Sequence, residues 1–223
     1  MNELLLHRRE MMGAGGGGGR LPKEFQEVSG MTAYGSGAYI MLPNLPALTN
    51  FKIVVDFYQM PRNQGGVFGI SNTYQYYVYG QLNGQSAAAA ARCGNGVAYI
   101  NTGFTPANDG IVSQNGERVL YELDTRTKTA SINGHALTWY SSPSSPSLPS
   151  NIPVFIRNHE GSISASYFGD IYEFSILDEN GDYVIQLIPC YRKADNEAGM
   201  YDIVNDVFYT NAGSGSFIVG PNV

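Results

Sequence analysis

Charged residues are scarce in this sequence, and acidic residues outnumber basic ones. The 223 residues include 13 Lys or Arg and 19 Asp or Glu, so the formal net charge is −6 at pH 7. A protein that neutralises the phosphates of DNA or RNA needs basic side chains clustered on one face. The composition therefore argues against nucleic acid as a partner.

Long apolar runs are also missing. No stretch approaches the roughly 20 apolar residues that a membrane-spanning helix requires, and the longest early run is Leu4-Leu5-Leu6. Arg8 and Arg9 follow this run, whereas a secretory signal carries its positive charges before the apolar segment. We therefore expect no membrane association and no export through a signal peptide.

Cysteine and histidine are rare. Two cysteines, Cys93 and Cys190, are too few for a disulfide framework or for a structural metal site. The three histidines lie far apart and lack the spacing of metal ligands. We expect no metal and no cofactor. Burial of both thiols is the simplest expectation for the cysteines, and a bridge between them is the alternative.

Glycine and aromatic residues, in contrast, are abundant. The chain has 27 Gly, 16 Tyr and 10 Phe. Aromatic residues favour strands, and glycines favour the tight turns that join them. This composition predicts an all-β protein. The length suits one sandwich domain with a single hydrophobic core.

The N-terminal part differs from the rest of the chain. Apart from Ala14, residues 13–19 are all glycine, so residues 13–20 are predicted to form a flexible linker. Apolar groups in residues 1–12 would line one side of a three-turn helix that orders on docking. A frayed terminus without a role is the alternative. The residues expected to anchor the protein to a larger assembly are Leu4, Leu5, Leu6, Arg8, Met11 and Met12.

From Leu21 onward, strands and turns alternate. Residues 51–58 place apolar side chains at every second position, which is typical of a half-buried strand. Residues 119–123 and 128–132 are predicted to form a hairpin. Asn133-Gly134 favours a tight turn into a further strand, residues 136–139.

Two further segments have an unusual composition. Serine and proline fill residues 141–153, so this segment is predicted to be an exposed loop and not a central strand. Residues 87–91 are all alanine, which fits either one turn of helix or a strand with small side chains.

The most specific pattern closes the chain. It runs from Gly169-Asp170-Ile171-Tyr172-Glu173-Phe174 through Leu187-Ile188-Pro189-Cys190-Tyr191-Arg192-Lys193 to Gly199-Met200-Tyr201-Asp202 and Phe208-Tyr209. In order and spacing it resembles the end of laminin-G-like (concanavalin A-like) jelly-roll modules. Such modules occur in tail, fibre and head-decoration proteins of bacteriophages and in surface proteins of gut bacteria. Weaker similarity extends over residues 21–223.

The resemblance implies a concanavalin A-like jelly-roll β-sandwich over residues 21–223, preceded by the linker and the anchor peptide. It also implies a virion protein of a phage head or tail, assembled in the host cytoplasm and docked to capsid or tail proteins through residues 1–12. A homo-oligomer, either a dimer or a trimer, is expected.

Aromatic side chains that could stack on a sugar are the best candidates for a binding site. Tyr77 and Tyr79 share one side of a tyrosine-rich strand, and Trp139 and Tyr140 border the Ser/Pro segment. We expect these four residues to contact a bacterial or mucin glycan. Packing in the core is the alternative for each of them.

Catalysis and calcium binding have weaker signals. Retaining glucanases of this fold place two carboxyl groups on one strand. Glu122 and Asp124 begin that pattern, but the position of the next acid is occupied by Arg126 or Thr127. Residues 178–182 begin like a calcium loop but lack its later glycine and glutamate, so a plain turn is expected.

Taken together, the sequence predicts a virion accessory protein that binds a glycan or host surface and is not an enzyme. A bacterial cell-surface lectin is the alternative, and a glycoside hydrolase is less consistent with the residues.

Overall fold

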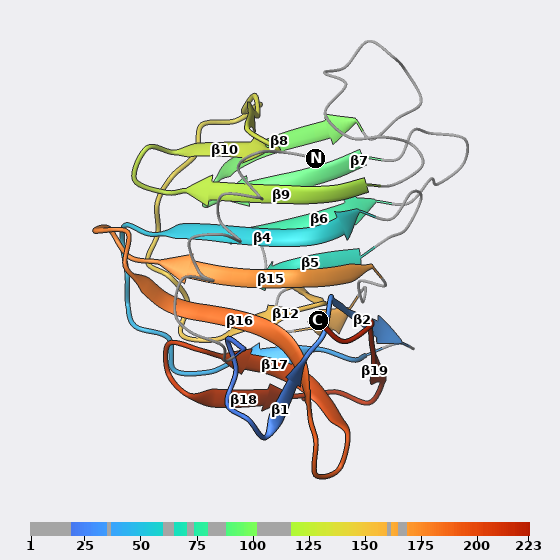
Figure 1. The fold of residues 1–223 in the computed structure, drawn as a ribbon. Coiled ribbons are helices and arrows are strands. Elements are labelled where there is room, and N and C mark those ends of the chain that lie inside the picture. The colour runs from blue at the N-terminus through green and yellow to red at the C-terminus, as the bar shows by residue number, and fades with distance from the viewer. Residues whose placement is uncertain are drawn as a thin grey trace.

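A computed structural model describes residues 19–34, 37–59, 65–70, 74–79, 88–101, 117–159, 162–164 and 169–223. Every regular element in these ranges is a β-strand. The strands form two sheets, and Figure 1 shows one sheet in front of the other. The prediction of an all-β sandwich is confirmed.

The larger sheet has eleven strands. Eight follow one another in space: β11 (His135–Ala136), β10 (Thr129–Ile132), β9 (Glu117–Asp124), β4 (Lys52–Gln59), β15 (Asp170–Leu177), β16 (Tyr183–Arg192), β17 (Glu197–Asp202) and β18 (Val207–Thr210). The other three are β1 (Phe25–Glu27), which pairs with β16, β2 (Met31–Tyr34), which pairs with β15, and β19 (Ser216–Val219), which pairs with β2. All these pairings are antiparallel.

The smaller sheet has eight strands. Their order is β14 (Ser162–Ser164), β13 (Arg157–His159), β5 (Gly65–Ile70), β6 (Tyr74–Tyr79), β7 (Ala88–Cys93) and β8 (Gly96–Asn101). A further strand, β12 (Ile152–Val154), pairs with both β5 and β3 (Ile40–Leu42). Residues 88–91 of the alanine run belong to β7, which favours the strand among the two expectations for this run.

The core lies between the two sheets. Phe68 of the smaller sheet meets Phe174 of the larger sheet edge to face, with ring centroids 5.6 Å apart. The ring of Tyr121 also lies next to Phe68, with a centroid distance of 6.0 Å. All three side chains are fully buried. Burial of each such ring contributes about 1.5 to 3 kcal/mol, so aromatic packing holds the two sheets together.

Several local predictions are confirmed. The hairpin of β9 and β10 pairs Asp124 with Thr129 across the turn at 125–128. Asn133 and Gly134 both have positive φ, 49° and 81°, as the predicted tight turn requires. Cys93 and Cys190 are buried free thiols on opposite sheets.

Two predictions need correction. The expected loop at 141–153 ends in a strand, because Pro153 belongs to β12. Strand β12 pairs with β5 only at Val154, so Pro153 takes no part in the pairing of these two strands. The strand expected at 136–139 is reduced to β11. After Leu137, whose N–H still bonds to the carbonyl of Ala130, the chain leaves β10 and reaches the smaller sheet, where the Tyr140 N–H bonds to the Val97 carbonyl.

Residues 1–18, and with them the anchor peptide and most of the linker, lie outside the described residues. The described chain begins beside the larger sheet, where the Arg20 guanidinium pairs with Glu27 and lies 3.6 Å from the carboxylate of Glu173 on β15. Within the described ranges, no helix is long and apolar enough to cross a membrane.

Candidate functional site

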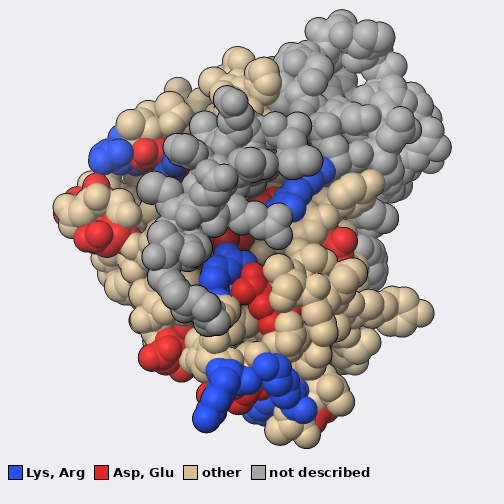
Figure 2. All heavy atoms as spheres, in the orientation of Figure 1, with Lys and Arg blue, Asp and Glu red and all other residues tan. Residues whose placement is uncertain are grey.

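One end of the sandwich gathers several turns that are linked by a network of polar contacts. We call it the loop end, and it comprises the turns at residues 125–128 and 178–182, the turn Gly94-Asn95, and the segment 137–151. The register brings the first two turns together, because Lys52 of β4 pairs with Asp124 on one side and with Leu177 on the other. They lie at the left of Figure 1, and charged side chains of both signs gather on the same side in Figure 2.

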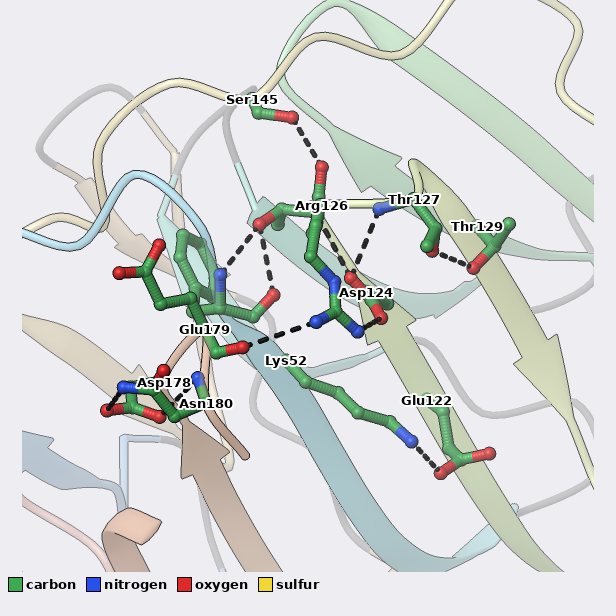
Figure 3. A network of polar contacts seen from close by, with 12 residues as sticks. Lys52, Glu122, Asp124, Arg126, Thr127, Thr129, Ser145, Asp178, Glu179 and Asn180 are labelled. Atoms are coloured by element: carbon green, nitrogen blue, oxygen red, sulfur yellow. Dashed lines mark hydrogen bonds and ion pairs between the residues drawn. The ribbon is translucent and has the colours of Figure 1, made fainter. Parts of the chain in front are cut away.

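Arg126 bridges these two turns. Its guanidinium donates to the Glu179 carbonyl oxygen at 3.2 Å and to the Asp124 carboxylate at 3.4 Å. Figure 3 shows this side chain reaching from one turn to the other. Next to it, Lys52 Nζ lies 2.6 Å from Glu122. The arginine therefore presents a charged group between two turns whose backbones are already fixed.

The 178–182 turn is fixed by its own first residue. The Asp178 carboxylate accepts hydrogen bonds from the backbone N–H groups of Asn180 and Asp182, at 2.8 and 3.0 Å. The bond from Asp182 is the main reason that the pKa of Asp178 lies below its usual value. Gly181, at φ 89°, completes the turn. These carboxylate oxygens satisfy the backbone, which confirms a plain turn here.

A small open cavity of about 110 Å³ lies between the two turns. Its polar lining consists of Lys52, Asp124, Arg126, Asp178, Glu179 and Asn180. Phe51 and Leu177 provide its apolar part. The cavity thus combines hydrogen-bond donors and acceptors of both charges with an apolar surface.

The Ser/Pro segment is held in place by its serines. Ser144 accepts a hydrogen bond from the Asn95 N–H and donates its own N–H to the Cys93 carbonyl, both at 3.1 Å. Ser145 donates to the Thr125 carbonyl at 2.7 Å. Ser141 accepts from the Val97 N–H and donates to the Asn95 carbonyl. The segment therefore connects the smaller sheet to the turn that carries Arg126.

Glycines permit this close contact. A Cβ atom on Gly96 would lie 2.4 Å from the Cα of Pro143, and one on Gly94 would lie 2.1 Å from the hydroxyl of Ser144. Gly94 also has a positive φ of 58°, which side chains disfavour. The fixed backbone of residues 141–145 thus depends on these two small residues.

No protein-family model matches the sequence, and no curated protein matches it. Solved structures do match. A native heptameric SAP-like pentraxin from Limulus polyphemus is similar over 88% of this chain and 95% of its own length, with 13% identity and a TM-score of 0.51. A protein from Bacteroides ovatus ATCC 8483, to which carbohydrate binding has been ascribed, is similar over 89% of this chain, with 8% identity and a TM-score of 0.55. This chain spans 62% of that protein.

The chain has the concanavalin A-like jelly-roll fold. The predicted fold class is thus confirmed. At identities this low, the likeness concerns the fold alone.

Within this jelly roll, the four predicted aromatic residues occupy two places. Tyr140 is 70% exposed at the start of the Ser/Pro segment, where its N–H bonds to the Val97 carbonyl at 2.8 Å. Trp139, in contrast, is partly buried and packs against the core. Tyr77 and Tyr79 lie on β6, opposite Ala90 and Ala88 of β7. Because β7 and β8 separate β6 from Ser141, the two places are about 15 Å apart along the sheet.

The predicted anchor residues Leu4, Leu5, Leu6, Arg8, Met11 and Met12 lie outside the described residues. The acidic residues considered for catalysis, in contrast, lie within the described residues. Glu122 and Asp124 share one face of β9, but Lys52 pairs with the first and Arg126 with the second. Among the described residues, no group of three His, Cys, Asp or Glu side chains could hold a metal ion.

The closing run has an architectural part. The Asp202 carboxylate is fully buried and accepts hydrogen bonds from the N–H groups of Gln186 and Val204 and from the amide of Asn205. In the turn between β16 and β17, the Arg192 guanidinium lies 2.6 Å from the Asp195 carboxylate. Sequence reasoning missed the cavity at Arg126, because the 125–128 and 178–182 turns are about 50 residues apart and only the sheet register unites them.

Proposed function

We propose that the protein is a non-catalytic glycan-binding module, and that its ligand contacts Tyr140 and the polar cavity at the loop end. The observation that carries this proposal is the 70% exposure of Tyr140 on a segment fixed by the hydrogen bonds of Ser141 and Ser144. A rigid aromatic ring presents an apolar face to a sugar without a large loss of side-chain entropy on binding.

The cavity supplies the polar half of such a site. Lys52 and Arg126 are donors, whereas Asp124 and the carbonyl oxygen of Glu179 are acceptors, so adjacent sugar hydroxyls find both kinds of partner. About 110 Å³ is less than the 300 Å³ or more of a site that encloses a drug-sized ligand. The cavity therefore suits one edge of a single sugar unit, with the rest of the glycan lying outside it.

Ion pairing at the acidic residues favours binding over hydrolysis. Retaining glycosidases need two carboxyl groups about 5 to 5.5 Å apart, one of them protonated at the start of the reaction. Glu122 and Asp124 are instead each engaged by a cation, since Lys52 Nζ lies 2.6 Å from Glu122 and Arg126 lies 3.4 Å from Asp124. The described arrangement supports a module that holds a sugar without cleaving it.

We further propose that the module is a phage virion protein, displayed on the head or tail and docked through residues 1–12. The support is the resemblance of the closing run and the apolar peptide on its glycine linker. The heptameric state of the Limulus pentraxin is consistent with an oligomeric protein. A bacterial surface lectin remains the second candidate, because the resemblance includes surface proteins of gut bacteria.

A glycan array probed with the full chain tests the binding function. We expect selective binding that Tyr140→Ala reduces at least tenfold. Val223→Ala is the control, since Val223 is also a highly exposed apolar residue, at 61%, but lies beyond β19 and outside the loop end. Loss of binding in both variants, or no binding by the wild-type chain, would refute the proposal.

Deletion of residues 1–12 tests the virion role. If the peptide docks the module, the shortened chain should remain folded and bind glycan but should no longer sediment with phage particles from the same host. Equal incorporation of both chains would refute the anchor, and association with the bacterial cell surface instead would favour the second candidate.

A further inference from the structure

Strand β19 combines an edge that pairs with no described strand with an exposed apolar side chain. In the described part of the chain it pairs only with β2, so one of its edges has no strand partner there. Ile218 of β19 is 52% exposed and Tyr34 of β2 is 63% exposed. We call the β19 edge with these two side chains the β19 patch.

The register places both side chains on the same outer face. Ile218 pairs with Thr32, and Ser216 pairs with Tyr34. The alternate residues of the two strands, Met31 and Ala33 on β2 and Phe217 and Val219 on β19, belong to the core or pack against it. Tyr34 and Ile218 are therefore diagonal neighbours, about 7 to 8 Å apart, a separation at which long side chains can contact each other.

Among the described residues, the patch also has no charged side chain of the kind that commonly protects a sheet edge. Residues 207–223 contain no Asp, Glu, Lys or Arg. Edge strands of soluble proteins are commonly guarded against pairing by charged side chains, by proline or by a covering segment. Here the strand itself reads Ser-Phe-Ile-Val, a sequence of high β-propensity with proline only two positions after its end, at Pro221.

The absence of charge on this strand permits contact between two copies of the chain. Two copies of the chain repel each other, since each has a net charge of −6. They can approach most closely where both surfaces are neutral. A strongly charged partner would find no opposite charge on the patch. Two antiparallel β19 strands related by a twofold axis would satisfy each other's open edge and bring each Ile218 and Tyr34 against the other copy.

We propose that the β19 patch is the contact through which two copies of this chain form a twofold dimer. In such a dimer the larger sheet of one copy continues into that of the other. Figure 1 shows β19 at the opposite side of the molecule from the turns of the loop end. Both candidate glycan sites stay open in the dimer, which would raise the avidity for a surface that carries many glycans.

Sedimentation velocity on the full chain, from micromolar to near-millimolar concentration, tests the dimer. We expect a species of twice the 24.2 kDa mass of one chain. Ile218→Lys should shift the midpoint of association to at least tenfold higher concentration, because two like charges would then oppose each other across the axis. Val204→Lys is the matched control. It places lysine on an aliphatic residue that is also exposed, at 42%, but lies in the turn before β18.

Hydrogen exchange separates a lost contact from a misfolded variant. Amides of residues 216–219 should exchange more slowly at high concentration in the wild-type chain and in Val204→Lys, but not in Ile218→Lys. The amides of β4 should keep their protection in all three proteins. A monomeric wild-type chain at every concentration would overturn the proposal, as would a dimer that Ile218→Lys leaves intact. Neither result depends on glycan binding, because no glycan is present.

Discussion

Replacement of Gly96 by alanine tests whether the Ser/Pro segment is fixed on the smaller sheet. The new Cβ atom would lie 2.4 Å from the Cα of Pro143 and 2.7 Å from its nitrogen. These are backbone and ring atoms, so no side-chain rotation relieves the overlap. Either residues 141–145 or the turn at Gly94-Asn95 must move.

The size of the effect follows from the bonds at this contact. Four backbone N–H groups take part, those of Asn95, Val97, Tyr140 and Ser144. If two or three of these bonds are lost, at about 1 kcal/mol each, the cost is about 2 to 3 kcal/mol. Alanine offsets about 0.5 to 1 kcal/mol by lowering the entropy of the unfolded chain. We therefore expect Gly96→Ala to lower the free energy of unfolding by about 2 kcal/mol, and Tm by about 4 to 8 °C.

Urea denaturation with hydrogen exchange is the appropriate assay. Gly19→Ala is the control, because a Cβ atom there meets nothing within 4 Å. In Gly96→Ala, the amides of Val97 and Ser144 should lose protection while those of the β9–β10 hairpin retain it. Unchanged stability together with unchanged protection of Val97 would show that the segment is not fixed in this way, and the argument for Tyr140 as a rigid platform would fail.

Three further predictions concern the fold. Phe174→Ala should cost about 3 to 5 kcal/mol in urea denaturation, because this buried ring joins the two sheets at Phe68; a loss below 1 kcal/mol would contradict the described core. Arg118→Ala should cost about 1 to 2 kcal/mol, since it removes two hydrogen bonds, of 2.8 and 2.6 Å, from the nearly buried Asp56 while Arg118 itself is half exposed, and an unchanged midpoint would exclude this contribution. Burial raises the pKa of Cys93 to about 11 and that of Cys190 to about 12, so both thiols should stay protonated and unreactive toward alkylating reagents at pH 9 until the protein unfolds. Rapid alkylation of the native protein at pH 9 would refute this low reactivity. Because both pKa values are raised in the folded state, the stability that the protonated thiols contribute is present below pH 9.0 and is lost as the pH rises toward 11 to 12.

Local patterns in the sequence predicted local structure well. The alternation in residues 51–58 yields β4, and Asn133-Gly134 forms the expected turn, because both signals depend on neighbouring residues only. The first two residues of β12 were assigned to the loop, because Pro153 is a poor strand residue and the partners of β12 are distant in sequence. Pro153 pairs with Met41 of β3, and Val154 pairs with Phe68 of β5.

The loop-end cavity shows the same limit. Sequence reasoning selected Tyr140 for its type and its place beside the Ser/Pro segment, and the structure exposes it. It did not find Arg126 as a bridge, because the carbonyl of Glu179 that it contacts is 53 residues away and is brought near by the pairing of β4 with β15. Serines that seemed to mark a mere exposed loop turned out to bond three other segments.

The most direct test of the central claim is an NMR map of the full chain titrated with the tightest-binding glycan from the array. The account predicts amide shift changes concentrated at residues 125–128, 140–146 and 178–182. The indole N–H of Trp139 and the amides of Phe68 and Phe174 in the core should stay unchanged. Saturable changes confined to another surface, or the absence of any glycan that binds, would contradict it.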